Sequence, residues 1–124
     1  MSPTIVLDPE GRPFMTIGAA GAMRIITAVS QIVMNVVDFG MLMDQAIEQP
    51  RIFNPAGGGK AGKLLIEEGI DPSTADYLKL RGHDLEIRPF SGYFGTAQGI
   101  LFDHTKNRMN GGADSRRLGV PVGY

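Results

Sequence analysis

One segment of this sequence restricts the possible folds more than any other: a short apolar run passes through a glycine-rich turn straight into a helical pattern. The apolar run spans Phe14–Ile17 and is typical of a strand. Gly18 and Gly21 follow it, and apolar residues then recur at helical spacing over 22–38. Such a turn leaves free backbone N–H groups at the positive end of a helix dipole. The segment therefore predicts a place where a negatively charged atom can approach the backbone.

The remaining patterns predict strands and helices within one domain, residues 1–124. A β-branched run at Thr4–Leu7 and turn residues at Asp8–Gly11 form a hairpin with the run at Phe14–Ile17. The other expected elements are helices over Leu42–Gln49 and Asp71–Arg81, a flexible linker over Asn54–Lys60, and strands over Lys63–Glu67, Asp84–Pro89, Phe94–Asp103 and Arg108–Asn110. Because hairpins pair antiparallel, we expect an α+β fold with mostly antiparallel strands and packed helices, and no doubly wound parallel sheet.

Composition excludes several classes of function. A net charge of -1, from 12 basic and 13 acidic residues, provides no field that would attract nucleic acid or an anionic membrane. The chain has no cysteine, so disulfides, thiolate metal sites and thiol catalysis are excluded. His83 and His104 have no ligand-like neighbours, and we expect neither a metal nor another cofactor. No apolar run reaches the length of a membrane span, and nothing in the sequence indicates a compartment.

The strongest chemical candidates are the backbone amides of Gly21 and Ala22. They can hold an anion or stabilise an oxyanion, although such small residues also allow a strand and a helix merely to pack closely. A phosphate or nucleotide site is the weaker alternative, because the turn lacks the Gly-Lys-Ser/Thr ending of a phosphate loop. Arg24 could help to hold an anion, but we expect a buried ion pair with a carboxylate instead. For Arg116 and Arg117 we expect solvation or ion pairs, with a phosphate contact as the less favoured alternative.

The order of several motifs resembles the C-terminal part of γ-glutamyltransferases. The motifs are MSPTIVLDPEG, the glycine-rich turn before RIITAV, NVVDFGM, AIEQPRIFN, the Lys63–Glu67 strand followed by Gly69 and Pro72, and the closing ADSRRLGVPVGY. They cover nearly the whole chain. The resemblance implies an amino-terminal-nucleophile hydrolase fold, an αββα sandwich of two sheets between helices. It also implies a precursor that cleaves itself, so that a new amino-terminal threonine attacks the γ-glutamyl amide of glutathione.

In that family, the turn equivalent to Gly18–Met23 carries two adjacent glycines whose N–H groups form the oxyanion hole. The resemblance therefore assigns this role to Gly21 and to Ala22, which stands in place of the second glycine. Ala20 and Met23 replace the usual proline and serine, which indicates a divergent member acting on some other amide. An alanine amide can still donate a hydrogen bond, but a positive φ at Ala22 would weigh against this role.

The resemblance further implies that essential parts lie outside this chain. Family members carry the Thr-Thr-His nucleophile segment, the residues that grip the substrate and a pair of serines ahead of the segment equivalent to MSPTI. None of these is found among the 124 residues. We therefore expect a C-terminal fragment of a small subunit that is inactive alone and needs the large subunit and the rest of the small subunit as partners. We also expect it to form a homo-oligomer. The alternative is a non-catalytic module that self-associates.

Overall fold

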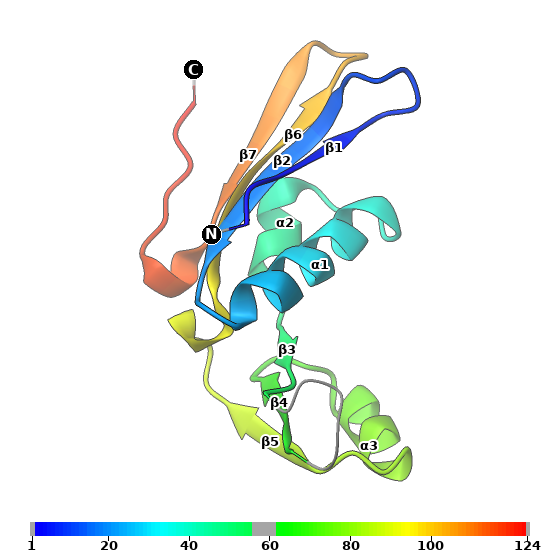
Figure 1. The fold of residues 1–124 in the computed structure, drawn as a ribbon, viewed down its shortest axis with the longest axis vertical. Coiled ribbons are helices and arrows are strands. Elements are labelled where there is room, and N and C mark those ends of the chain that lie inside the picture. Colours follow the sequence, from blue (N-terminus) through cyan, green and yellow to red (C-terminus); the bar gives the residue numbers. More distant parts are fainter. Residues whose placement is uncertain (1, 56–61, 124) are drawn as a thin grey trace.

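The computed structural model describes residues 2–55 and 62–123, and its main feature is a four-stranded antiparallel sheet (Figure 1). The strands lie in the order β1 (Thr4–Leu7), β2 (Pro13–Ala20), β6 (Thr96–Asp103) and β7 (Arg108–Ala113). Helices α1 (Arg24–Val37) and α2 (Met43–Glu48) pack on one face of this sheet. Strands β1 and β2 form the expected N-terminal hairpin, and β6 and β7 form the second hairpin.

The core lies between the two helices and the helix-facing side of the main sheet. Side chains alternate along β2, so Met15, Ile17 and Ala19 are buried while the residues between them are only partly covered. Ile32 of α1 and Ala97 of β6 belong to the same buried cluster. The apolar residues of α1 that recur every three or four positions form this inner stripe, as the sequence pattern predicts.

Two glycines allow α2 to lie very close to the sheet. Gly99 of β6 and Gly112 of β7 are directly opposite each other and face α2. A Cβ atom at Gly112 would lie 2.8 Å from backbone atoms of Met43 and Asp44, and one at Gly99 would lie 2.7 Å from the Met43 sulfur. These contacts leave no room for a larger residue, so the glycines set the spacing between the helix and the sheet.

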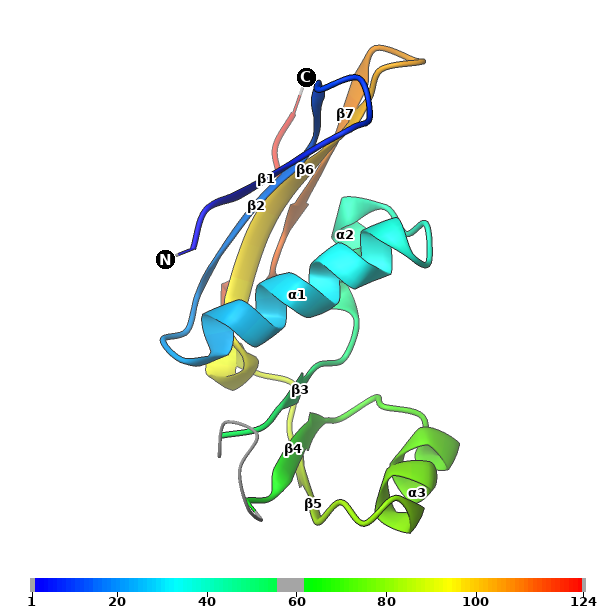
Figure 2. The same ribbon diagram turned by 45° about the vertical axis from the view of Figure 1, so that its right-hand side comes forward.

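A second, smaller sheet lies beyond one end of the main sheet (Figure 2). Strand β3 (Ile52–Phe53) pairs antiparallel with β4 (Leu64–Glu67), and β4 pairs parallel with β5 (Leu85–Arg88). Helix α3 (Pro72–Leu80) connects the two parallel strands, because parallel neighbours need a crossover connection. A short 3-10 turn, η1 (Gly92–Phe94), then leads from the small sheet back to β6 in the main sheet.

The α+β class and most of the predicted elements are confirmed. The expected N-cap is present, since the Asp71 carboxylate accepts a hydrogen bond from the Ser73 amide at 2.8 Å. The predicted helix start at Ala22 is wrong, because Ala22 has a φ of 53° and cannot be part of an α-helix. The strand predicted to end at Ile17 continues to Ala20, where it still pairs with β6.

Two further differences concern the middle of the chain. The two-residue strand β3 and the small sheet with its parallel pair were not predicted, because pairing between short segments depends on distant residues. The linker predicted over Asn54–Lys60 lies mostly outside the described residues. No helix in the described ranges is long and apolar enough to cross a membrane.

Two apolar surfaces remain open in the described part of the chain. On α1, Ile26, Met34 and Val37 are exposed, so the few polar residues of this helix do not reflect burial on several sides by the described residues. On the main sheet, Ile5 and Ile100 lie on the face opposite the helices and are also exposed. The described residues therefore cover the sheet with helices on one face only (Figure 2).

The close contact at Gly112 leads to a stability prediction. Gly112→Ala should lower the free energy of unfolding by about 1–3 kcal/mol, because the new methyl group would collide with the backbone of α2. Gly18→Ala is the matched control, since a Cβ atom there would meet nothing within 4 Å. Urea unfolding monitored by circular dichroism measures both changes. Equal midpoints for the two variants would contradict the close packing of α2 on β7.

Candidate oxyanion site

The turn between β2 and α1 holds two backbone amides without hydrogen-bond partners in the described part of the chain. The carbonyl groups of Gly21 and Ala22 are engaged, because they accept hydrogen bonds from the amides of Arg24 and Ile25, both at 3.1 Å. The N–H groups of Gly21 and Ala22 donate to no described residue. Ala22 is also exposed at the surface. Two free donors therefore lie next to the N-terminus of a 14-residue helix, as an anion site requires.

Ala22 has the positive φ that weighs against an alanine at this position. Its φ of 53° is in the left-handed region, where an alanine costs about 1–2 kcal/mol relative to its preferred conformations. The positive φ that would weigh against an oxyanion role for Ala22 is thus present. It strains the backbone conformation of Ala22. It does not engage the N–H group, which has no described partner that would prevent it from donating to a ligand.

Gly21 is in a position that only glycine can occupy. Its φ is 146°, and a Cβ atom there would lie only 2.8 Å from the Cα atom of Gly95, just before β6. Ala20 and Thr96 are the last paired residues of β2 and β6, so Gly21 and Gly95 lie one step beyond the end of the ladder. The two strands thus stay in contact where the turn begins.

Arg24 lies against aromatic rings, and the predicted ion pair with a carboxylate is wrong for the described residues. Its guanidinium carbon is 3.9 Å from the centre of the Tyr93 ring and 5.2 Å from that of Phe53. Cation–π contacts of this kind attract a guanidinium without a carboxylate. The rings come from η1 and β3, which the sequence did not place near α1.

Four charged side chains form a buried cluster behind the turn. Arg51, Glu67 and Asp114 are each 1% exposed, and Arg116 is 9% exposed. Arg51 Nη2 donates to Asp114 Oδ2 at 2.8 Å, and Arg116 Nε donates to Glu67 Oε1 at 2.8 Å. Arg116 Nη1 also reaches Asp114 Oδ1 at 3.1 Å. Two positive and two negative side chains are therefore buried together, and their ion pairs offset part of the free-energy cost of removing each charge from water.

The net effect of burial and ion pairing on the pKa differs between the two arginines. Burial lowers the pKa of Arg51, and the charge of Asp114 only partly opposes it. Burial also acts to lower the pKa of Arg116, but the hydrogen bond and charge of Glu67 together with Asp114 outweigh it and raise that pKa. Since arginine keeps its proton across the physiological range, both guanidinium groups stay charged and both need their carboxylates.

Gly95 connects the buried cluster to the turn. Arg51 Nη1 donates to the Gly95 carbonyl oxygen at 2.8 Å, and Gly95 is the residue against which Gly21 packs. The sequence prediction of an ion pair is confirmed for Arg116, whereas Arg117 is exposed. Arg51 was not singled out, because nothing in its neighbours along the chain indicates that it is buried.

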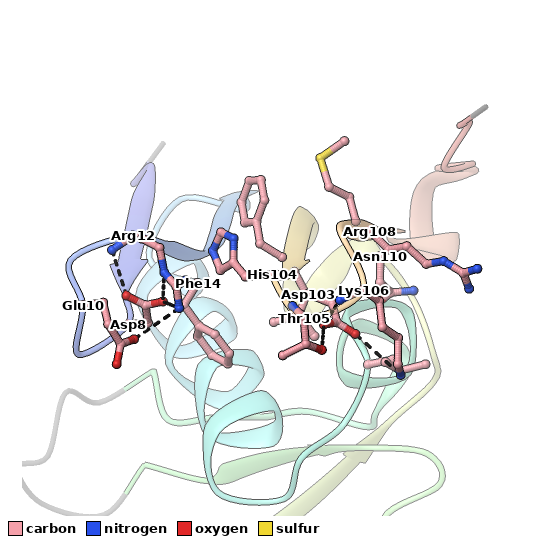
Figure 3. Close-up of a pocket in the computed structure, with 14 residues that line it drawn as sticks. Asp8, Glu10, Arg12, Phe14, Asp103, His104, Thr105, Lys106, Arg108 and Asn110 are labelled. Atoms are coloured by element: carbon pink, nitrogen blue, oxygen red, sulfur yellow. Dashed lines mark hydrogen bonds and ion pairs between the residues drawn. The ribbon is translucent and has the colours of Figure 1, made fainter.

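A separate cavity of about 660 Å³ lies at the other end of the main sheet, between the turns of the two hairpins (Figure 3). Most of its charged groups pair with one another: Arg12 contacts Asp8 at 2.8 Å, and Lys106 contacts Asp103 at 3.6 Å. Arg108 also lines the cavity and forms no ion pair with a described residue. His104 is bound to the Pro13 carbonyl oxygen at 2.7 Å. Within the described ranges, no group of three or more His, Cys, Asp or Glu residues could hold a metal ion. The cavity thus offers mostly paired charges, and it lies at the opposite end of β2 from Gly21.

Comparisons with known proteins find relatives along the whole chain. The family model described as Gamma-glutamyltranspeptidase matches residues 1–124. The glutathione hydrolase proenzyme of Escherichia coli (strain K12) is 33% identical over 125 residues, which cover 100% of this chain and 20% of that relative. The Acylase ACY 1 proenzyme of Pseudomonas sp. (strain SE83) is 32% identical over 122 residues, which cover 98% of this chain and 20% of that relative.

A solved structure has the same architecture. A mutant of the Helicobacter pylori gamma-glutamyltranspeptidase matches with a TM-score of 0.80 and 30% sequence identity, over 94% of this chain and 61% of that chain. The fold is therefore part of the amino-terminal-nucleophile hydrolase fold. The chain spans about a fifth of the length of the curated relatives it matches, so those proteins are much longer. Because the family model matches every residue from 1 to 124, the chain belongs to the γ-glutamyltranspeptidase family.

Proposed function

We propose that these 124 residues supply the oxyanion-stabilising amides of a γ-glutamyl amide hydrolase and acyltransferase. The observation that carries the proposal is the pair of free N–H groups at Gly21 and Ala22, beside the N-terminus of α1. The family membership supports the reaction class, and γ-glutamyl amides such as glutathione are the proposed substrates. The attacking threonine, in this proposal, belongs to polypeptide outside the 124 residues.

The chemistry follows from where negative charge develops. When a threonine hydroxyl attacks an amide carbonyl carbon, the carbonyl oxygen gains a full negative charge in the tetrahedral intermediate. Two fixed N–H donors at the positive end of a helix stabilise this oxygen more than they stabilise the neutral substrate. The intermediate then expels the amine and leaves an acyl-enzyme, which water or the amino group of an acceptor attacks in turn. The same two amides serve both steps, since each one forms an oxyanion at the same carbon.

The substrate class depends on groups that surround the turn as well as on the turn itself. Amides at Gly21 and Ala22 recognise an oxyanion whatever acyl group carries it. A relative named as an acylase shares 32% of the aligned residues, so membership of the family is compatible with more than one amide substrate. The replacement of a second glycine by Ala22 places a methyl group at the exposed side of the turn, which favours an enzyme that diverges from glutathione hydrolases.

Activity in isolation and in context tests the proposal. The 124-residue chain alone should release no p-nitroaniline from γ-glutamyl-p-nitroanilide, because it lacks the nucleophile. A chimera in which it replaces the aligned 125 residues of the Escherichia coli relative should release p-nitroaniline, measured by absorbance. The matched control is the same chimera with its nucleophilic threonine changed to alanine. Turnover by the isolated chain, or a folded chimera without turnover, would count against the proposal.

Ala22→Gly tests the conformation of the turn. The free energy of unfolding of the chain should rise by about 1 kcal/mol, because glycine occupies a φ of 53° without the cost that alanine has there. In the chimera, kcat should be unchanged or higher, since the N–H donor is retained. The control Ala20→Gly, in strand β2, should instead lower stability by about 0.5–1 kcal/mol. Destabilisation by both variants in urea unfolding would contradict the left-handed conformation of Ala22.

Self-association is a second candidate property, favoured by apolar side chains that are exposed on the face of the main sheet opposite the helices. Ile5 is 66% exposed and Met109 is 70% exposed on the face opposite the helices. Exposed apolar faces of this kind mark surfaces that other polypeptide covers. A second copy of the chain could cover this one when no other segment is present.

Sedimentation velocity at tens of micromolar should therefore show a dimer or a larger oligomer. Ile5→Lys should shift the chain toward monomer, because a charge would then have to be buried in the interface. Leu80→Lys, on α3 and far from this face in sequence and structure, is the control and should leave the distribution unchanged. A monomeric native chain at this concentration would exclude self-association.

A further inference from the structure

We propose that Arg51 is a positioning residue for the oxyanion turn, because it fixes Gly95 and Gly95 in turn fixes Gly21. This inference rests on the proposed role of the Gly21 and Ala22 amides. Arg51 does not reach the turn itself, and it acts through one backbone contact. The path runs from the buried Asp114 carboxylate through the Arg51 guanidinium to the Gly95 carbonyl, and from the Gly95 Cα atom to Gly21.

The first step of the path is the guanidinium of Arg51. Its Nη1 atom donates to the Gly95 carbonyl oxygen at 2.8 Å, and its Nη2 atom donates to the Ile47 carbonyl oxygen at 2.7 Å and to Asp114 at 2.8 Å. The planar fork of an arginine can satisfy these three acceptors at once, whereas the ammonium of a lysine is a compact group on a flexible chain. Because the side chain is buried, water does not compete for these acceptors.

The second step is the contact between two glycine backbones. Gly95 has a φ of 86°, and a Cβ atom there would lie 3.3 Å from the Ala20 carbonyl oxygen and 3.4 Å from the Ala28 side chain. On the other side, a Cβ atom at Gly21 would lie 2.8 Å from the Gly95 Cα atom. Gly95 is thus held between the end of β2 and the first turns of α1. A shift of Gly95 would therefore change its packing against both elements that border the free amides.

The inter-strand ladder does not hold this contact by itself. The last pair of β2 and β6 is Ala20 with Thr96, so no ladder pair joins Gly21 to Gly95. The hydrogen bond from Arg51 to the Gly95 carbonyl supplies the attachment at this point, and Asp114 fixes Arg51 and also accepts from the Ala97 amide at 2.9 Å. An error of about 1 Å in the position of a catalytic group can reduce a rate by about 100-fold. By fixing the position of Gly95, Arg51 therefore helps to fix the position of the proposed oxyanion donors.

Two buried arginines of the same cluster provide a matched comparison. Arg51→Lys should weaken the nuclear Overhauser effect between the α-protons of Gly21 and Gly95 and should shift the Gly21 and Ala22 amide resonances. Arg116→Lys disturbs the same cluster, but Arg116 donates to Glu67, Asp114, Ile47 and Gln49 and not to Gly95. It should leave the Gly21–Gly95 effect in place. Equal losses in both variants, or no loss in either, would overturn the positioning role.

A second variant changes the contact and leaves the charges intact. Gly95→Ala should shift the Gly21 and Ala22 amide resonances while the Arg51 side-chain resonances stay near their native positions. This variant decides the question if Arg51→Lys does not fold. Unchanged Gly21 and Ala22 resonances in folded Gly95→Ala would overturn the path through Gly95.

Kinetics of the chimera separate this inference from the proposed function. Arg51→Lys should lower kcat for γ-glutamyl-p-nitroanilide by about tenfold with KM changed less than twofold, because displaced donors weaken transition-state stabilisation. The loss in Arg116→Lys should be several-fold smaller. If the unaltered chimera has no activity, the proposed function fails, while the resonance shifts still decide whether Arg51 positions the turn. If kcat falls equally in both variants while the chimera is active, the positioning role fails and the proposed function stands.

Discussion

The structure depends on a buried cluster of charges that joins its two sheets. Arg51 directly precedes β3 and Glu67 ends β4 of the small sheet, whereas Asp114 and Arg116 follow β7 of the main sheet. Each guanidinium needs its carboxylates, because removing one partner of a buried pair costs about 3–5 kcal/mol. The cluster is also joined to the end of α2, because both arginines donate hydrogen bonds to the Ile47 carbonyl oxygen. Separation of the two sheets would therefore break the Arg51–Asp114 and Arg116–Glu67 ion pairs.

Glycines bring the backbones of different elements into contact around this cluster. Gly99 and Gly112 let α2 lie against the sheet, and Gly21 and Gly95 let the turn before α1 lie against the start of β6. Contacts without side chains are short and stiff, so small displacements pass from one backbone to the next. The amides of Gly21 and Ala22 thus lie at a closely packed backbone contact, as the proposed role of preorganised donors requires.

The described surface agrees with membership of a family of longer proteins. The chain spans about a fifth of its curated relatives, and the described residues place no helix on one face of the main sheet and leave apolar side chains of α1 exposed. Apolar side chains such as Ile26 and Met109 are exposed on these faces. In an amino-terminal-nucleophile hydrolase two sheets lie face to face, and the main sheet here supplies one of them. The free amides and the open sheet face both identify places where further polypeptide is expected.

Local patterns in the chain were sufficient for the class of fold and for the candidate amides. The hairpin at β1 and β2, the stripe of α1 and the Asp71 cap depend on residues close together in sequence, and the turn at Gly21 and Ala22 lies between two such elements. Resemblance of motifs then supplied the proposed role of the two amides. The same information placed the start of α1 too early, at Ala22, because only the folded backbone shows that Ala22 is left-handed.

Long-range partners were decided by folding alone. Arg51 and Asp114 are 63 residues apart, and Glu67 and Arg116 are 49 apart, so no local pattern connects them. Arg24 lies against Tyr93 and Phe53 for the same reason, in place of the carboxylate expected from its charge. Periodicity and turn chemistry act over a few residues, whereas burial of a charge depends on which distant segments close around it. The amino-acid sequence thus determined where the glycine-rich turn with free amides occurs, and packing of the two sheets determined which buried charges lie behind it.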